Sequence, residues 1–371
     1  MSLTKDQAVY CANIFSNYFD KFSRIDEYMR EQKKVSMAER PFVLPGMGPE
    51  EDLFSDFTIS PEKMNFEIVE LPQERWDIYL NMISSHSNMT SIPGRSLRLA
   101  VLETTTNKWC GFIRLGSPVI NCKPRNEMLG QVFTQIDGGA QLFNQCAVMG
   151  FVIVPAQPFG FNYLGGKLMA AICTTHEVRE KLNKKYDMTT CLFETTSLYG
   201  STKAVSQYDG MKPYIRYKGL TDSDFLPMLH GKTYTDLKDY IENILGEPLA
   251  PEAASSRKLK ISNAIVSHIN VALRGTPEGA KFKQTIENAK NLNEQKRYYV
   301  SDYGFNNMID FVNGKTNKLT KGENYDKFYL KNVIEWWRKK ATNRFENLKA
   351  ENRLRTDIEV WTGDTELDII R

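Results

Sequence analysis

The sequence predicts an α/β fold with helical additions at both ends, and two observations carry this prediction. Between residues 95 and 221, short apolar runs are separated by turn residues and by one long amphipathic stretch, which is typical of strands joined by turns and helices. After residue 221 the pattern becomes helical and rich in lysine. The 371 residues fit two or three domains. We therefore expect three parts, at 1–94, 95–246 and 247–371.

Local patterns predict the elements of the core in chain order. The segment TTTN at 104–107 is turn material between two strand-like runs and indicates a hairpin. A helix of about 20 residues is expected after the glycine-rich turn near residue 160, and a shorter helix at 201–211. The strands are expected at 95–104, 108–118, 144–155, 189–200 and 212–221.

Both ends of the chain show mainly helical patterns. Apolar residues recur at helical spacing over 5–33. Prolines and glycines in 36–63 indicate an extended linker, and alternation over 64–72 indicates a strand before a helix at 72–86. After the core, a mixed segment is expected at 297–315. The later helices are expected at 235–246, 255–275, 278–295 and 324–355.

The composition excludes several classes of protein. With 41% hydrophobic and 25% charged residues, the chain is an ordinary globular protein rather than a disordered one. It has no apolar run of the ~20 residues that a membrane span needs, and its first residues do not resemble a secretory signal. We therefore expect a cytoplasmic protein with reduced, buried cysteines. Neither its six cysteines nor its four histidines show metal-ligand spacing, so no metal site is predicted.

The charge of the chain is unevenly placed. Residues 255–355 carry 21 Lys and Arg against 10 Asp and Glu, a net charge of +11, whereas the remainder carries −8. A basic segment that also contains aromatic residues is typical of nucleic-acid binders, because Lys and Arg neutralise phosphates. The alternative is a solvated, lysine-rich helical surface with no partner. Net charge speaks to partners and not to fold.

The most informative stretch lies at 150–180, where a strand, a glycine-rich turn and a helix follow one another. A helix N-terminus offers unpaired N–H groups and a positive dipole end, and glycines allow a phosphate to approach the backbone. Gly160, Gly165 and Gly166 stand at the expected position of such a loop. The alternative is a tight turn whose glycines serve close packing.

Two motifs in order along the chain resemble the GNAT acyltransferase superfamily. One is Gln157-Pro-Phe-Gly160 after the strand, and the other is Ala204-x-x-x-Tyr208 followed by Gly210-Met211. The loop is longer than in that family, and Met211 replaces a phenylalanine. The resemblance implies a mixed, mostly antiparallel central sheet with flanking helices. It also implies acetyl-CoA or another acyl-CoA as cofactor, held by Val154, Gln157, Gly160, Gly165, Gly166 and Lys167.

Within that superfamily the sequence is similar to the phage Mu Mom-type DNA-modification proteins and to the DruA-like proteins of phage defence. The similarity rests on Asn144-Gln145 before the central strand and on Glu194-Thr195-Thr196 followed by Tyr199-Gly200-Ser201. It implies a phage-associated protein that acts on nucleic acid, with DNA favoured.

Acyl transfer to an amine needs a base and a proton donor for the leaving group. Glu194, at a strand end, is the candidate base, and its alternative role is to hydrogen-bond a turn. Tyr199 or Tyr208 is the candidate acid, with Tyr208 matching the position of the family's tyrosine; the alternative for Tyr208 is core packing. Further candidates for the same cleft, or for substrate binding and nucleophilic attack, are Ser197, Ser201, Asn144 and Glu103.

A pair of tryptophans near the C-terminus lies in a basic stretch. Aromatic rings can stack on bases while cations hold phosphates. Adjacent residues on a helix point about 100° apart, so at least one of Trp336 and Trp337 is expected in the core. The candidate nucleic-acid-binding residues are Trp336, Arg338, Lys339, Lys340 and Arg344.

Two functions therefore stay open at this stage. The first is a GNAT-like transferase that transfers an acyl or related group to a nucleobase amine. The second is a nucleic-acid-binding protein without catalysis, built on a degenerate GNAT-like core. Neither requires a membrane, and the sequence leaves the oligomeric state open. A fold does not fix function by itself.

Overall fold

The computed structural model describes residues 2–23, 27, 28, 31, 46–84, 94–119, 121–197, 206–221, 228–252, 257–290 and 296–360. Its contacts divide the chain into two compact units. The described residues of unit 1 fall within Met1–Val35 and Asp222–Gln295, and those of unit 2 within Ser36–Thr221 and Lys296–Glu366.

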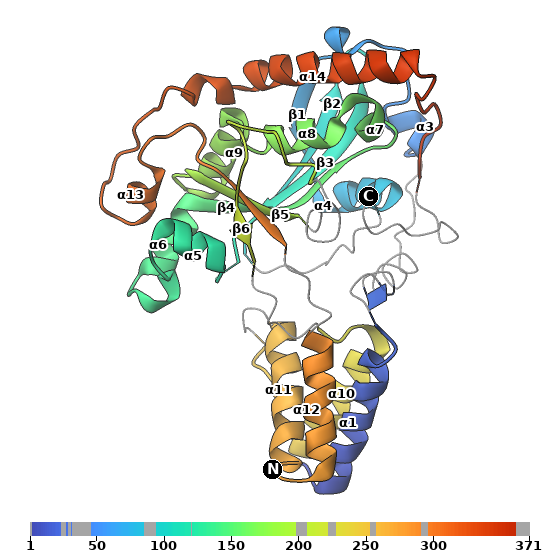
Figure 1. The fold of residues 1–371 in the computed structure, drawn as a ribbon, viewed down its shortest axis with the longest axis vertical. Coiled ribbons are helices and arrows are strands. Elements are labelled where there is room, and N and C mark those ends of the chain that lie inside the picture. Colours follow the sequence, from blue (N-terminus) through green and yellow to red (C-terminus); the bar gives the residue numbers. More distant parts are fainter. Residues whose placement is uncertain are drawn as a thin grey trace. The chain divides into compact units, whose positions relative to one another are not determined.

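Unit 2 is built on a seven-stranded sheet with the order β1-β2-β3-β4-β5-β7-β6. All neighbouring strands are antiparallel except β4 and β5, which are parallel (Figure 1). The fold is thus mixed α/β with a mostly antiparallel sheet, as expected. The strands are β1 Phe66–Glu70, β2 Ser96–Glu103, β3 Lys108–Gly116, β4 Ala147–Pro155, β5 Leu192–Ser197, β6 Arg216–Leu220 and β7 Arg297–Ser301.

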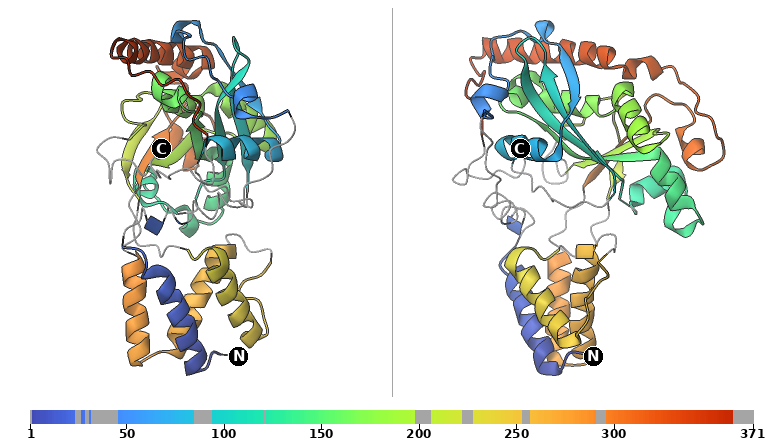
Figure 2. Two further views of the ribbon diagram at one scale, coloured as in Figure 1. Left: turned by 90° about the vertical axis from the view of Figure 1, so that its right-hand side faces the viewer. Right: turned by 180° about the vertical axis from the view of Figure 1, so that it is seen from behind.

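Helices cover both faces of this sheet (Figures 1 and 2). Successive strand residues point to opposite faces: Ala100 packs in one apolar cluster with Trp76 of α4 (Gln73–Ile83), whereas Leu99 packs in another with Leu168 of α8 (Gly165–Ile172). Further helices and turns of unit 2 are α3 Pro49–Asp52, η1 Pro61–Lys63, α5 Lys123–Leu129, η2 Phe133–Gln135, α6 Gly139–Cys146, α7 Phe159–Tyr163, α9 His176–Tyr186, α13 Met308–Val312, η3 Tyr325–Phe328 and α14 Leu330–Ala350.

Strands β4 and β5 stay together for only four residues. Residues 147–150 pair with 192–195, and beyond this point β4 continues to Pro155 paired with β3 alone. The first turn of α8 and the turn at 206–210 lie near this separation, as shown below.

Unit 1 is helical over its described residues and has its own core (Figure 1). Its helices are α1 Lys5–Phe19, α10 Gly231–Leu245, α11 Arg257–Ala272 and α12 Pro277–Lys290. The last three are inserted between β6 and β7, and α1 packs against all of them. Thr4 and Gln7 form a capping box at the start of α1, which satisfies two backbone N–H groups.

The contacts group the elements differently from the expected boundaries at 94/95 and 246/247. A boundary after residue 246 would separate α10 from α11, which pack together in unit 1. It would also assign β7 to a helical region, although β7 lies between β5 and β6 in the sheet. The expected helix at 201–211 is a turn over its described residues 206–210, and the long helix after residue 164 is divided into α8 and α9.

All six cysteines are buried and none forms a disulfide, as expected. Within the described residues, no helix combines the length and apolarity needed to cross a bilayer. No group of three or more His, Cys, Asp or Glu side chains in the same residues is arranged to hold a metal ion.

His176 gives unit 2 a pH-dependent contact. Its ring is 1% exposed, stacks 4.0 Å from Tyr325, and its Nε2 donates to the Tyr325 carbonyl at 2.9 Å. Burial, with the charges of Arg179 and Lys321, lowers the pKa of His176 to about 4. Between pH 6.5 and 4 the unfolded chain therefore binds a proton that the folded chain does not. We expect up to about 3 kcal/mol of stability to be lost as the pH falls through this range.

The measurement is urea denaturation at pH 7 and pH 4.5, compared with the same pair of curves for His176→Gln. The glutamine keeps a donor and does not titrate, so its loss of stability should be smaller than that of the wild type. Equal losses in the two proteins would contradict the role of His176.

Candidate functional site at the separation of two strands

The point where β4 and β5 separate is held by a side chain of β5. Thr195 Oγ1 donates to the carbonyl of Gly150 at 2.9 Å, at the last paired position of the two strands. Beyond this position, β4 and β5 are no longer paired with each other. We call the residues around this point, Gly150, Lys167, Thr195, Tyr208 and Asp209, the splay site.

The first turn of α8 reaches the splay site through Lys167. Its Nζ donates to the carbonyls of Gln207 at 2.9 Å and Asp209 at 2.6 Å. Burial and the neighbouring charge of Lys340 lower the pKa of Lys167. A Cβ on Gly166 would stand 2.7 Å from the Gln207 Oε1, so the glycine permits this close approach. The turn at 206–210 is therefore fixed against α8.

Tyr208 lies inside the splay site with its ring 5% exposed. Its hydroxyl has the side chains of Thr195 and Gln207 as hydrogen-bond partners, and burial raises its pKa, so the phenol holds its proton at neutral pH. The ring packs edge-on against Tyr299 at 5.3 Å. Both the proton-donor role and the packing role that the sequence left open for Tyr208 are compatible with this position.

Next to Tyr208, Asp209 joins β7 to the turn. Its Oδ1 accepts from the Tyr299 hydroxyl at 2.9 Å and from Arg297 Nη2 at 3.2 Å. The side chains of Asp209 and Arg297 remain 30% and 21% exposed. The splay site thus borders on a half-buried cluster of one carboxylate, one guanidinium and one phenol.

Glu194 lies on the other face of the sheet, which corrects its predicted partnership with Tyr208. Glu194 and Thr195 are successive residues of β5, so their side chains point to opposite faces. The register agrees, because Thr195 is paired with Tyr299, whereas the partner of Glu194 in β7 is Val300. A pocket lined by Glu194 and Tyr208 together is therefore not formed.

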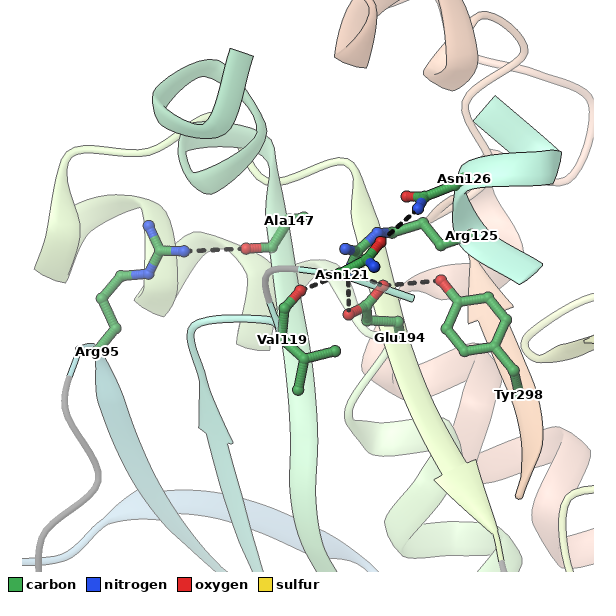
Figure 3. A network of polar contacts seen from close by, with 8 residues as sticks. All are labelled: Arg95, Val119, Asn121, Arg125, Asn126, Ala147, Glu194 and Tyr298. Carbon is green, nitrogen blue, oxygen red and sulfur yellow. Dashed lines mark hydrogen bonds and ion pairs between the residues drawn. The ribbon is translucent and has the colours of Figure 1, made fainter. Parts of the chain in front are cut away.

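Glu194 instead belongs to a buried network with α5 (Figure 3). Arg125 Nη1 donates to its Oε1 at 3.0 Å and to its Oε2 at 3.3 Å, and Tyr298 donates to Oε2 at 2.7 Å. The same Nη1 donates to the carbonyl of Val119 at 2.8 Å, and the guanidinium lies 4.4 Å from the ring of Phe143.

Both charged side chains of this network are 0% exposed. Burial raises the pKa of Glu194, and the charge of Arg125 partly offsets this effect. A fully enclosed carboxylate with these partners has no contact with solvent through which to exchange protons. Its arrangement is that of a structural ion pair rather than of a catalytic base.

The backbone amides of the predicted phosphate loop are bonded inside the protein. Gly160 N–H donates to the carbonyl of Ala156 at 2.8 Å, Phe161 N–H to the Gln157 Oε1 at 3.0 Å, and Asn162 N–H to the carbonyl of Pro158 at 2.9 Å. These residues form α7, which stands between β4 and α8. Three of the amides expected to face a pyrophosphate are thus already satisfied.

Packing explains the glycines of this loop. A Cβ on Gly160 would stand 2.4 Å from the Gln157 side chain, and one on Gly165 2.6 Å from the ring of Phe159. The tight-turn alternative that the sequence left open accounts for both positions.

The C-terminal segment of the chain also lies on this loop. Asn162 pairs with the backbone of Arg355, donating from Nδ2 at 2.8 Å and accepting at Oδ1 at 3.1 Å. Glu359 N–H donates to the carbonyl of Gln157 at 3.0 Å. The guanidinium of Arg355 stacks 4.0 Å from the ring of Phe161. The outer side of the predicted cofactor loop is therefore occupied by residues 355–359.

Other predicted site residues lie away from the splay site. Asn144 is exposed in α6, before the opposite end of β4, and its carbonyl accepts from Arg95. Glu103 is buried at the β2–β3 turn and accepts from the N–H groups of Asn65, Thr105 and Thr106. Val154 packs with the apolar cluster of α4.

Of the candidates at the end of β5 and just after it, the structure describes only Ser197. Ser197 is buried at the end of β5, on the face of Thr195. Tyr199 and Ser201 lie outside the described residues.

On α14, the five predicted nucleic-acid-binding residues divide into two kinds. Arg338 donates to the Met64 carbonyl at 2.7 Å, and Arg344 stacks on Phe161 at 4.7 Å, so both guanidinium groups bind other parts of unit 2. Lys339 and Lys340 are exposed, and Trp336 is partly buried with the ammonium group of Lys340 5.6 Å from its ring.

Sequence reasoning missed three residues beside the splay site and two in the buried network. Asp209 stands directly after the predicted Tyr208, and Arg297 and Tyr299 are in β7, about 90 residues away. The other two are Arg125 and Tyr298. Only Asp209 had a local signal, its place in the Tyr208–Gly210 motif.

A comparison with family models finds a match to the family described as Druantia protein DruA, over residues 46–217. The match runs from the start of the described part of unit 2 into β6 and thus includes the splay site up to Asp209. No curated protein and no solved structure matches the chain. The match supports the DruA part of the resemblance. The Mom-type and acyltransferase parts stay predictions.

Proposed function

We propose that the protein acts in defence against phage and that unit 2 is a GNAT-like group-transfer core that modifies nucleic acid at the splay site. The separation of β4 from β5 after four paired residues carries this proposal. The GNAT family has a splayed strand before its cofactor loop, and a separation of this kind supports the resemblance; Tyr208 and the first turn of α8 lie beside it. The match to the DruA family supports the link to phage defence.

The chain's own residues support a proton-donor role for Tyr208. Burial keeps its phenol protonated, and Thr195 and Gln207 orient the hydroxyl. A protonated phenol can donate to a leaving group as it departs. Lys167, whose pKa is lowered, adds a cationic group that interacts with negative charge at the same place.

The donor of the transferred group stays open. Three amides after Pro155, those of Gly160, Phe161 and Asn162, are bonded to protein atoms, and residues 355–359 lie on the same loop. These bonds leave fewer free donors on α7 for a pyrophosphate, so acyl-CoA stays an untested prediction and no step is derived through it.

The test is mass spectrometry of nucleosides from the DNA of phage-infected cells that carry the wild-type protein, Tyr208→Phe or no protein. We expect a modified nucleoside with the wild type and its loss by a factor of about 100 or more with Tyr208→Phe, since a positioned general acid contributes 10²–10⁴-fold. Tyr214→Phe is the matched control, because Tyr214 is also a buried tyrosine of this segment but packs on Phe328.

A specific observation favours the second function, nucleic-acid binding without catalysis. The bonded amides and the location of Glu194 on the far face are what a degenerate GNAT-like core would show. This function predicts unchanged nucleosides in all three strains and phage protection that survives Tyr208→Phe. Protection that is lost together with a modified nucleoside would exclude it.

A further inference from the structure

A strip of cationic and aromatic side chains runs across unit 2 beside the splay site. Its first part is on α14 and α8, where Lys340 lies 5.6 Å from the Trp336 ring and its charge acts on Lys167. Lys167 contacts the carbonyl of Asp209, whose carboxylate binds Arg297. The hydrogen bonds and the ion pair are continuous from Lys167 on α8 to Arg297 on β7, and the charge of Lys340 on α14 acts on Lys167 without a direct contact.

The second part of the strip is on β6, which is the edge strand of the sheet. Arg297 stacks 4.3 Å from the ring of Tyr217. The Tyr217 side chain is 44% exposed on this edge strand, so one side of its ring is open to a partner. Lys218 follows Tyr217 and lies at a register shift between Tyr217 and Gly219. A β-bulge of this kind changes the direction in which the bulged side chain points.

The strip is cationic overall. Lys212 and Lys218 are exposed beside Tyr217 in sequence, and Lys339 and Lys340 are exposed on α14. Asp209 and Asp302 are engaged by the guanidinium groups of Arg297 and Arg216, and the exposed Glu335 of α14 is outnumbered by Lys339 and Lys340. Phosphate groups are the complement of such a surface.

We propose that this strip, made of Lys167, Lys212, Tyr217, Lys218, Arg297, Lys339 and Lys340, is the path of a single-stranded nucleic acid whose bases stack on Tyr217. The inference rests on the proposed function, since it names the form of the substrate that reaches the splay site. Ring faces of bases are available for stacking in a single strand, whereas in a duplex neighbouring base pairs cover them. A half-exposed tyrosine with a guanidinium stacked on it, flanked by lysines, is suited to the unpaired form.

The strip also explains how one base comes to the reacting centre. Arg297 contacts both Tyr217, on the strip, and Asp209, in the splay site. A strand held across Tyr217 therefore lies beside the splay site, and no duplex base has to be unpaired and unstacked to bring it there.

The test is fluorescence anisotropy with a labelled 20-nucleotide single strand and the corresponding duplex, at a series of salt concentrations, using the full-length protein. We expect the single strand to bind more tightly, and Tyr217→Ala to weaken it about tenfold with little change in the salt slope, as for the loss of one stacked base. The matched control is Tyr10→Ala in unit 1. Tyr10 is 51% exposed and also contacts another aromatic ring, so its loss should leave binding unchanged.

The charge contribution is tested separately. The double variant Lys212→Ala/Lys218→Ala should lower the salt slope of single-strand binding by about 1.4, about 0.7 for each lost phosphate contact. Lys181→Ala/Lys184→Ala removes two exposed lysines of α9 and should leave the slope unchanged.

The result that overturns the inference is tighter binding of the duplex, or equal affinity of Tyr217→Ala and the wild type for the single strand. These outcomes differ from those that test the proposed function. Single-strand binding through Tyr217 with unchanged nucleosides would remove the transferase and keep the strip. A modified nucleoside, together with wild-type single-strand affinity of Tyr217→Ala, would keep the transferase and remove the strip.

Discussion

Replacing Arg125 by methionine is expected to lower the free energy of unfolding of unit 2 by about 3–5 kcal/mol, because it leaves the carboxylate of Glu194 buried without its counter-charge. Both side chains are 0% exposed, and Arg125 also serves the carbonyl of Val119. In the variant, Tyr298 remains as a single neutral donor to Glu194. The loss should therefore greatly exceed that of an ordinary hydrogen bond.

Tryptophan fluorescence in urea measures this change on unit 2 alone. Trp76, Trp109, Trp336 and Trp337 lie in unit 2, and the sequence has no tryptophan in Met1–Val35 or Asp222–Gln295, so the signal reports on unit 2. Arg353→Met is the matched control, because its ion pair with Glu351 is more than half exposed on both sides. Its effect should stay within about 1 kcal/mol.

A second variant keeps the test informative if Arg125→Met does not fold. Arg125→Met combined with Glu194→Leu removes both buried charges, and should recover part of the stability lost by the single change. A double variant less stable than Arg125→Met would contradict the ion-pair explanation. So would a single variant with the wild-type urea midpoint.

The strands and helices of this protein were predictable because their signals are local. The runs at 95–104 and 108–118 alternate around turn residues and form β2 and β3, and the periodicity at 324–355 marks α14. The grouping into two units has no such signal. It depends on contacts of α1 with α10–α12, more than 200 residues later, and on β7 joining β5 about 100 residues after it.

The candidate site shows the same limit on a smaller scale. Gly166, Lys167 and Tyr208 were predicted from motifs, and the structure brings them together at one point. Period-two alternation already places Glu194 and Thr195 on opposite faces of β5. It does not tell which of these faces α8 covers, and Arg125 comes from α5, a helix that the sequence did not indicate. The expected pairing of Glu194 with Tyr208 in one pocket therefore does not form.

Two adjacent tryptophans on α14 give the second large prediction. Trp337→Ala is expected to destabilise unit 2 by about 3–5 kcal/mol, the range for truncating a large buried side chain. Trp337 is 0% exposed, donates from Nε1 to the carbonyl of Tyr163 at 2.8 Å and packs edge-on against Phe66 at 5.0 Å. Truncation opens a cavity and leaves that carbonyl without its donor.

Trp336→Ala is the natural control, since it removes the same side chain one position earlier on the same helix. Trp336 is only partly buried, and packs edge-on against Tyr214 at 4.9 Å. Its loss should cost less than half as much in the same urea experiment, while each variant keeps four tryptophans as probes. Equal losses would mean that α14 does not present these two faces, one to the core and one towards the strip. Because successive helix residues differ by about 100°, the pair of variants reports directly on the rotation of α14 about its axis.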